Sequence, residues 1–142
     1  MSDEERYGVR DLTYSKWHRP SSGFLGTNIS YIDLDCCEYC KVCYTPLALL
    51  ELAKDVGQPD KAVMVTHHLA KQANLPAYLV FYRPNPDVRG GIDRFRIRQI
   101  YPEGSFSFEL MLAPDDYASW LTAFHDEHHC HRWKEINNDN TK

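Results

Sequence analysis

The strongest constraint on the fold is Ala77–Tyr82, a run of six apolar or aromatic residues. It is apolar on both faces, which is typical of a strand buried in the middle of a sheet. The preceding residues 60–74 place small and apolar side chains at helical spacing, and Leu75-Pro76 closes this helix. A helix that leads into a central strand predicts an α/β layer.

Three further segments have a clear period. Residues 29–35 alternate as a strand would, with Asp33 and Asp35 on one face. Residues 92–101 also alternate, and 106–112 are predicted to return as the partner strand. A closing helix is predicted from Pro114, with a packing stripe of Tyr117, Trp120, Leu121 and Phe124. Residues 46–54 are ambiguous, because their propensity favours a helix while a short apolar run also suits a buried strand.

The 142 residues suit one domain. We expect a partly flexible N-terminal segment over 1–28, the domain over 29–132 and a flexible tail over 133–142. No apolar run approaches about 18 residues and the polar N-terminus does not resemble a secretory signal, so we expect a cytoplasmic protein without a membrane partner. The oligomeric state is left open.

Asp33, Asp35 and Glu51 are the candidate ligands of a hard cation. Carboxylates at the ends of adjacent strands suit Mg²⁺ or Mn²⁺, which take one or two protein oxygens and keep several waters. The alternative is that Asp33 and Asp35 form the solvated face of an edge strand.

Four of the five cysteines lie within eight residues, which favours metal binding over disulfides in a reducing compartment. Cys37, Cys40 and Cys43 form two overlapping C-x2-C pairs, the spacing of a structural Zn²⁺ knuckle. A further ligand must come from Cys36 or from the tail 128–131, if that helix end folds back. Otherwise these are reduced cysteines at a hairpin tip, and the histidine-rich tail is a solvated helix end.

Basic side chains are the candidate nucleic-acid contacts. The formal charge of -4 does not favour general binding of nucleic acid, so any contact must rest on local patches. On the strand 92–101 we expect Phe95 and Ile97 to point inward and the arginines outward. The predicted contacts are Lys16, His18, Arg19, Arg94, Arg96 and Arg98; the alternative is a solvated charged face.

The order of these pieces resembles the core of the PD-(D/E)XK (restriction-endonuclease-like) nuclease superfamily. The resemblance rests on Tyr31–Asp35, on Leu49–Lys54, and on the helix and strand that follow. Small bacteriophage members also have an upstream Trp-His-Arg segment, here Trp17–Arg19. The resemblance implies that residues 46–52 form a strand. The fold would then be a mixed central β-sheet flanked by helices, with the cysteine knuckle inserted between two strands.

The resemblance also implies the roles of the site residues. Asp33, with Asp35 as helper or substitute, and Glu51 would hold the metal ion. The family expects a water-orienting lysine at position 53, which is alanine here, and Lys54 follows. On a regular strand Glu51 and Lys54 point to opposite faces, so Lys54 could serve only through a bulge or past the strand end.

The implied activity is hydrolysis of DNA with Mg²⁺ or Mn²⁺ by a phage-encoded nuclease in the host cytoplasm. A second hypothesis is an inactive nuclease-like module that binds a host protein or nucleic acid, for example in counter-defence. A third is a zinc-stabilised interaction domain in which residues 46–56 form a helix.

Overall fold

The computed structural model describes residues 11–103 and 109–130. The chain divides into two units, Met1–Asp33 and Leu34–Lys142. The described part of the first unit contains helix α2 (Thr13–His18) and a 3-10 turn, η1 (Pro20–Ser22). Among the described residues, none of the helices has both the length and the apolar character needed to cross a bilayer.

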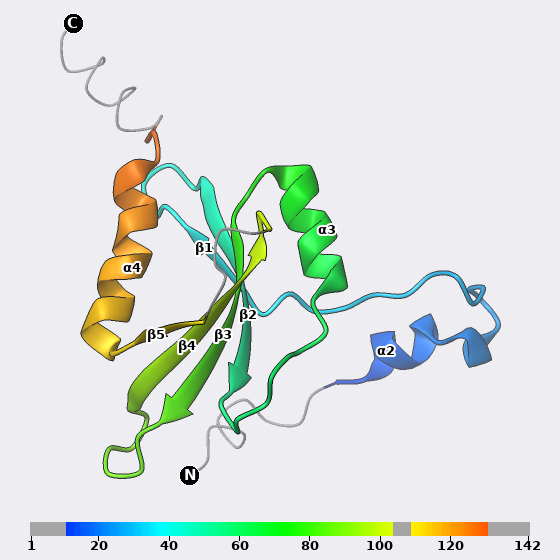
Figure 1. The fold of residues 1–142 in the computed structure, drawn as a ribbon. Helices are drawn as coiled ribbons and strands as arrows, with labels where there is room; N and C mark the ends of the chain where they lie inside the picture. Colours follow the sequence, from blue (N-terminus) through cyan, green and yellow to red (C-terminus); the bar gives the residue numbers. More distant parts are fainter. Residues whose placement is uncertain (1–10, 104–108, 131–142) are drawn as a thin grey trace, which may run out of the picture. The chain divides into compact units, whose positions relative to one another are not determined.

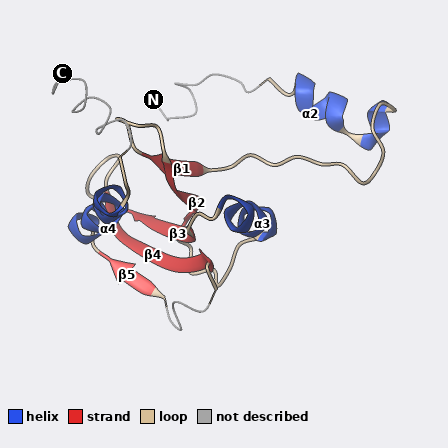
Figure 2. Ribbon diagram, turned by 90° about the horizontal axis from the view of Figure 1, so that it is seen from above, coloured by secondary structure: helices blue, strands red, loops and turns tan. Residues whose placement is uncertain are grey.

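In its described residues, the second unit is a five-stranded mixed sheet with one helix on each face (Figures 1 and 2). The strands lie in chain order, and only β2 and β3 are parallel, because helix α3 connects them. This confirms the predicted α/β fold with a mixed sheet. The elements are β1 (Cys36–Tyr39), β2 (Pro46–Lys54), α3 (Met64–Ala73), β3 (Ala77–Pro84), β4 (Ile92–Tyr101), β5 (Leu110–Leu112) and α4 (Pro114–Glu127).

Helix α4 covers one face of the sheet with the predicted stripe. The ring centroid of Trp120 lies 4.7 Å from that of Tyr78, and Tyr117 stacks on Phe95 with ring centroids 3.7 Å apart. The sheet side of this core contains Leu50, Val80 and Ile97, which are almost fully buried. Pro114 begins the helix at a position that needs no N–H partner, and Asp115 and Asp116 follow in the first turn.

Helix α3 covers the opposite face. Leu49, Leu79 and Phe81 form the apolar part of this core, with Ala70 of α3 against them. This face also contains two buried charged residues, Glu51 and Arg96. Burial of a charge requires partners, so the polar contacts of these two residues define the chemistry of this face.

The structure differs from the sequence prediction at two boundaries. Residues 29–35 form no strand; the strand begins at Cys36. The side chain of Asp35 accepts a hydrogen bond of 2.9 Å from the N–H of Leu52. This bond takes the place of a backbone hydrogen bond between two strands. The helix predicted from residue 60 begins at Met64, because the preceding residues contact the sheet through Pro59 and Lys61.

The ambiguous segment 46–54 is a strand, as the family resemblance implied. The predicted strand 92–101 is confirmed as β4. The strand predicted over 106–112 is observed as β5, which is shorter, and residues 104–108 lie outside the described part of the chain. The tail 133–142 lies outside it too.

Candidate functional site

Asp35 and Glu51 meet around the ammonium group of Lys61. Lys61 Nζ lies 2.7 Å from Asp35 Oδ2 and 3.2 Å from Glu51 Oε2. The same ammonium donates a hydrogen bond of 3.1 Å to the backbone carbonyl of Leu52. Two carboxylates and one carbonyl therefore surround a single cation, and we call these four residues the acidic centre.

The fold fixes both carboxylates. Glu51 lies in the middle of β2 and faces α3, where the hydroxyl of Thr66 donates to Glu51 Oε1. Glu51 is only 5 % exposed and Thr66 only 1 %, so their hydrogen bond satisfies buried polar atoms. Asp35 directly precedes β1, and the N–H of Leu52 holds its carboxylate against β2.

The charges of the acidic centre support one another. Burial tends to raise the pKa of Asp35, but hydrogen bonds from Lys61 and from the Leu52 N–H outweigh it, so this pKa lies below its ordinary value. Burial tends to lower the pKa of Lys61, but hydrogen bonds to Asp35 and Glu51 hold it above its ordinary value. Asp35 and Lys61 are therefore both charged near neutral pH.

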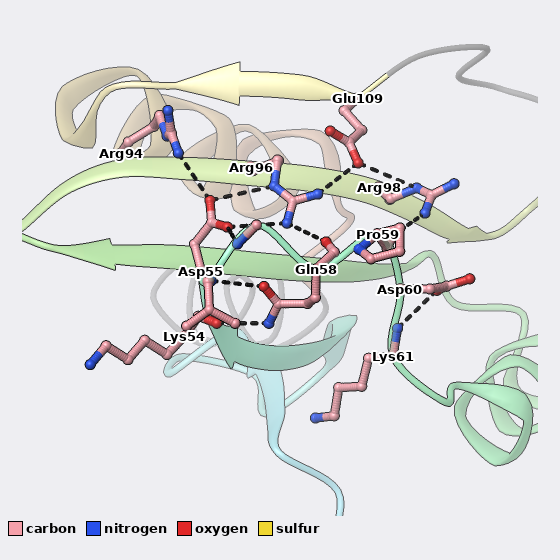
Figure 3. A network of polar contacts seen from close by, with 12 residues as sticks. Lys54, Asp55, Gln58, Pro59, Asp60, Lys61, Arg94, Arg96, Arg98 and Glu109 are labelled. Atoms are coloured by element: carbon pink, nitrogen blue, oxygen red, sulfur yellow. Dashed lines mark hydrogen bonds and ion pairs between the residues drawn. The ribbon is translucent and has the colours of Figure 1, made fainter.

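The predicted catalytic residue Lys54 lies elsewhere. Lys54 is exposed at the end of β2, and its ammonium points away from the surrounding polar network (Figure 3). β2 pairs with β3 in regular register through Lys54, so no bulge turns this side chain toward Glu51. Asp33 is the last residue of the N-terminal unit, and its role as a metal ligand stays a prediction. The lysine at the centre is Lys61, which sequence reasoning missed.

The loop that delivers Lys61 is anchored by the arginines of β4 (Figure 3). Asp55 accepts from Arg94 and from Arg96, each at 3.1 Å. Arg96 also donates to the carbonyl of Gln58 at 2.7 Å, and Arg98 donates to the carbonyl of Pro59. The hydrogen bond from Arg96 is the main reason that the pKa of Asp55 falls to about 2.

The arginines of β4 alternate with Phe95 and Ile97 as predicted, but Arg96 does not point into solvent. It is 8 % exposed, its guanidinium lies 4.0 Å from the ring centroid of Phe81, and it pairs with Asp55 and Glu109. The loop after β2 covers this part of the face, which is the reason for the difference. Arg94 and Arg98 keep exposed side-chain fractions of 35 % and 43 %. Their role as nucleic-acid contacts stays a prediction.

The other predicted nucleic-acid contacts, Lys16, His18 and Arg19, lie in the N-terminal unit. There, the ring of His18 contacts Tyr31 at 4.8 Å, and Trp17 stacks on Phe24 at 5.5 Å. Trp17 and Phe24 are also exposed, to 44 % and 71 %. Exposed rings among basic side chains are typical of surfaces on which bases stack, although the role itself stays a prediction.

A cavity of about 330 Å³ lies between α3 and β4 on the face that contains Glu51. Its lining includes His67, His68 and Arg98. It also includes Asp60, which directly precedes Lys61 in the sequence. Glu103, which also lines it, pairs with His67. The cavity lining therefore combines basic side chains with two carboxylates.

A second cluster brings together Cys40, Cys43, His128 and Cys130. One ligand atom from each of these residues lies within 4.8 Å of the other three, so the cluster could hold a metal ion. Cys40 and Cys43 belong to the predicted knuckle, and the chain after α4 supplies the other two. Cys37 lies on β1, where it pairs with Leu49, and is not among the four. His131 lies outside the described residues.

Local contacts favour the metal-binding form of the knuckle thiols. A hydrogen bond with the Thr45 hydroxyl is the main reason that the pKa of Cys43 falls to about 5. Hydrogen bonding to the backbone N–H of Cys43 likewise lowers the pKa of Cys40. By contrast, burial raises the pKa of Cys36 to about 11, in keeping with its place outside the cluster.

Comparison with known proteins found no matching family model, no matching curated protein and no matching solved structure. The function must therefore be argued from the acidic centre, the Cys3His cluster and the fold that holds them.

Proposed function

We propose that the chain is a metal-dependent deoxyribonuclease of the PD-(D/E)XK type, with Asp35, Glu51 and Lys61 as its catalytic residues. The observation that carries the proposal is the convergence of three oxygens on the ammonium of Lys61. A pocket of two carboxylates and a carbonyl is built to hold a cation, and its hard oxygen donors match the preference of Mg²⁺ and Mn²⁺.

The arrangement of elements supports the proposal. The acidic residues lie directly before β1 and within β2, and β2 is joined to the parallel β3 through α3. This is the order that the sequence resemblance to these nucleases implies. The departure is the lysine, which comes from the loop after β2 in place of the strand itself.

Asp35, Glu51 and the Leu52 carbonyl would hold the metal ion. When bound, Mg²⁺ or Mn²⁺ supplies an acidified water and neutralises charge on the phosphate. For the ion to enter, Lys61 must leave its position among the three oxygens. Its ammonium, still tethered close to Asp35, would then orient the attacking water and donate hydrogen bonds to the phosphate. Thr66 would keep the Glu51 carboxylate in place, and Arg98 would bind a phosphate at the rim of the cavity.

The same geometry also favours a second candidate, an inactive nuclease-like module that binds a host protein or nucleic acid. Lys61 already satisfies the three oxygens, so the acidic centre is stable without a divalent ion. In that case the lysine has replaced the metal permanently, and Mg²⁺ would have no effect on the protein.

The test is DNA cleavage with Mg²⁺ or Mn²⁺ on supercoiled, linear, branched and single-stranded substrates. We expect cleavage that a chelator stops and that Glu51→Gln reduces by about 100-fold or more. Glu38→Gln is the matched control, because Glu38 is a half-buried residue of β1 that lies outside the acidic centre. Equal cleavage by wild type and Glu51→Gln would reject the active site. Absence of cleavage on all four substrates would favour the binding module.

A further inference from the structure

We propose that Cys40, Cys43, His128 and Cys130 form a closed Zn²⁺ site that joins the β1–β2 turn to the chain after α4. The proposal goes beyond DNA hydrolysis, since the cluster shares no residue with the acidic centre. It also replaces the ligand set that the cysteine spacing suggested, because Cys37 takes no part and the second half of the set lies far away in the sequence.

The distances within the cluster match the edges of a tetrahedron. Cys40 Sγ and Cys130 Sγ are 4.0 Å apart, and Cys43 Sγ lies 3.4 Å from His128 Nε2. For Zn–S bonds of about 2.3 Å and a Zn–N bond of about 2.0 Å, tetrahedral geometry gives about 3.8 Å between sulfurs and about 3.5 Å between sulfur and nitrogen. The Cys40–Cys130 separation is about twice a disulfide bond length, so the two sulfurs are spaced as shared ligands.

The imidazole of His128 is oriented as a zinc ligand. Its Nδ1–H donates to the backbone carbonyl of His125, which leaves the lone pair of Nε2 directed at Cys43. A metal-bound histidine almost always fixes its other ring nitrogen in this way. The orientation is independent of the cysteine spacing and points to the same site.

The knuckle has the backbone that a C-x2-C pair needs. The N–H of Tyr44 donates to the Cys40 carbonyl at 2.7 Å, and the Cys40 N–H donates to Thr45 at 2.9 Å. Tyr44 has a φ of 61°, in the left-handed region that a residue with a Cβ rarely adopts. The strained backbone of Tyr44 is therefore part of the turn that directs the thiols of Cys40 and Cys43 toward one point.

Three thiolates and one imidazole select Zn²⁺ over Mg²⁺ or Ca²⁺, which prefer oxygen donors. All four positions of a tetrahedral ion are filled by protein, so no position remains for a substrate and the role is structural. The ion would link residues 85 to 90 positions apart in the chain, Cys43 to His128 and Cys40 to Cys130. It would fix the edge hairpin β1–β2, and with it Asp35, which directly precedes β1, to helix α4.

The experiment is metal analysis of the full chain, expressed with Zn²⁺ and purified without chelator. We expect about one zinc per chain and no visible absorption. X-ray absorption should give three sulfurs at about 2.3 Å and one nitrogen at about 2.0 Å. Cys43→Ser and His128→Ala should lose the zinc, whereas Cys37→Ser and His129→Ala, on neighbouring residues outside the cluster, should keep it.

Zinc retained in Cys43→Ser or His128→Ala, or lost in Cys37→Ser, would overturn the ligand set. A visible spectrum with bound iron and sulfide, or a chain without metal, would overturn the ion. If the ligand variants do not fold, the absorption measurement on wild type decides alone. None of these results depends on DNA cleavage.

Discussion

At the scale of single residues, two arginines and a backbone N–H hold the buried carboxylate of Asp55. Its side chain is 3 % exposed and pairs with Arg94 and Arg96. The N–H of Gly57 donates to the same carboxylate at 2.9 Å, and the φ of 80° that this turn requires is accessible to glycine. Asp55 thus holds the start of the loop that ends at Lys61.

Asp55→Asn should lower the free energy of unfolding by about 3 kcal/mol, because Arg96 would stay buried with half of its charge compensation. Asp93→Asn is the matched control. Asp93 pairs with Arg83 at the surface, where both side chains are partly exposed, so its loss should cost less than about 1 kcal/mol. Urea denaturation of both variants near neutral pH gives the comparison; equal losses would contradict the role of Asp55.

The ion pair of Asp55 with Arg96 predicts that stability depends on pH with a definite sign. The pKa of Asp55 is about 2 in the folded chain and 3.8 as its ordinary value. The stability that it contributes is therefore complete above the ordinary value and is lost as the pH falls through about 2. The difference in stability between wild type and Asp55→Asn should shrink over that window. A difference that stays constant from neutral pH to pH 2 would contradict the assignment.

At the scale of elements, α4 depends on its aromatic stripe. Trp120 contacts Tyr78 and Phe124 with ring centroids 4.7 and 4.9 Å apart. Trp120→Ala should therefore lower the free energy of unfolding by about 3–5 kcal/mol. Ser119→Ala, on the exposed side of the same helix, should change it by about 0.5 kcal/mol or less. Thermal unfolding of both variants tests this; similar melting temperatures would show that the stripe does not anchor α4.

How far the sequence predicts these elements depends on whether their period is distinctive. The apolar residues alternate over much of β4 and recur at helical spacing in α4, and both elements are confirmed. Apart from Glu51 and Lys54, the residues of β2 are apolar, so its period is uninformative and only the family resemblance indicated a strand. Residues 29–35 have a strand's alternation, but Ile32 and Leu34 are exposed and no strand of the described chain pairs with them. Alternation in the sequence therefore does not show that a neighbouring strand is available for pairing.

The same limit applies to the candidate sites. Asp35, Glu51, Cys40 and Cys43 lie on or beside regular elements and could be singled out from spacing. Lys61 reaches the acidic centre through an irregular loop held by Arg96, and no periodicity places a loop residue. His128 and Cys130 could be named only as part of a tail, because their approach to the knuckle depends on how α4 packs.

At the scale of the whole molecule, charge is distributed between the two units. The chain has a net charge of -4, so binding of DNA must use local basic surface. Arg94 and Arg98 have partly exposed guanidinium groups on the second unit, and the predicted contacts Lys16 and Arg19 lie on the first. The guanidinium of Arg96 is occupied by its bonds to Asp55 and Gln58 in the loop after β2. The arginines of β4 therefore mainly stabilise the fold, and any contact with DNA would use the exposed parts of Arg94 and Arg98.

The central claim is that Lys61 is the catalytic lysine of a metal-dependent nuclease. The most direct measurement is single-turnover DNA cleavage with Mg²⁺ by Lys61→Met and, as the matched control, Lys54→Met. Lys61→Met should lose about 100-fold or more in rate, with the zinc content unchanged. Lys54→Met should cleave at the wild-type rate, because the Lys54 side chain points away from the acidic centre. Full activity in Lys61→Met, or a loss confined to Lys54→Met, would contradict the account.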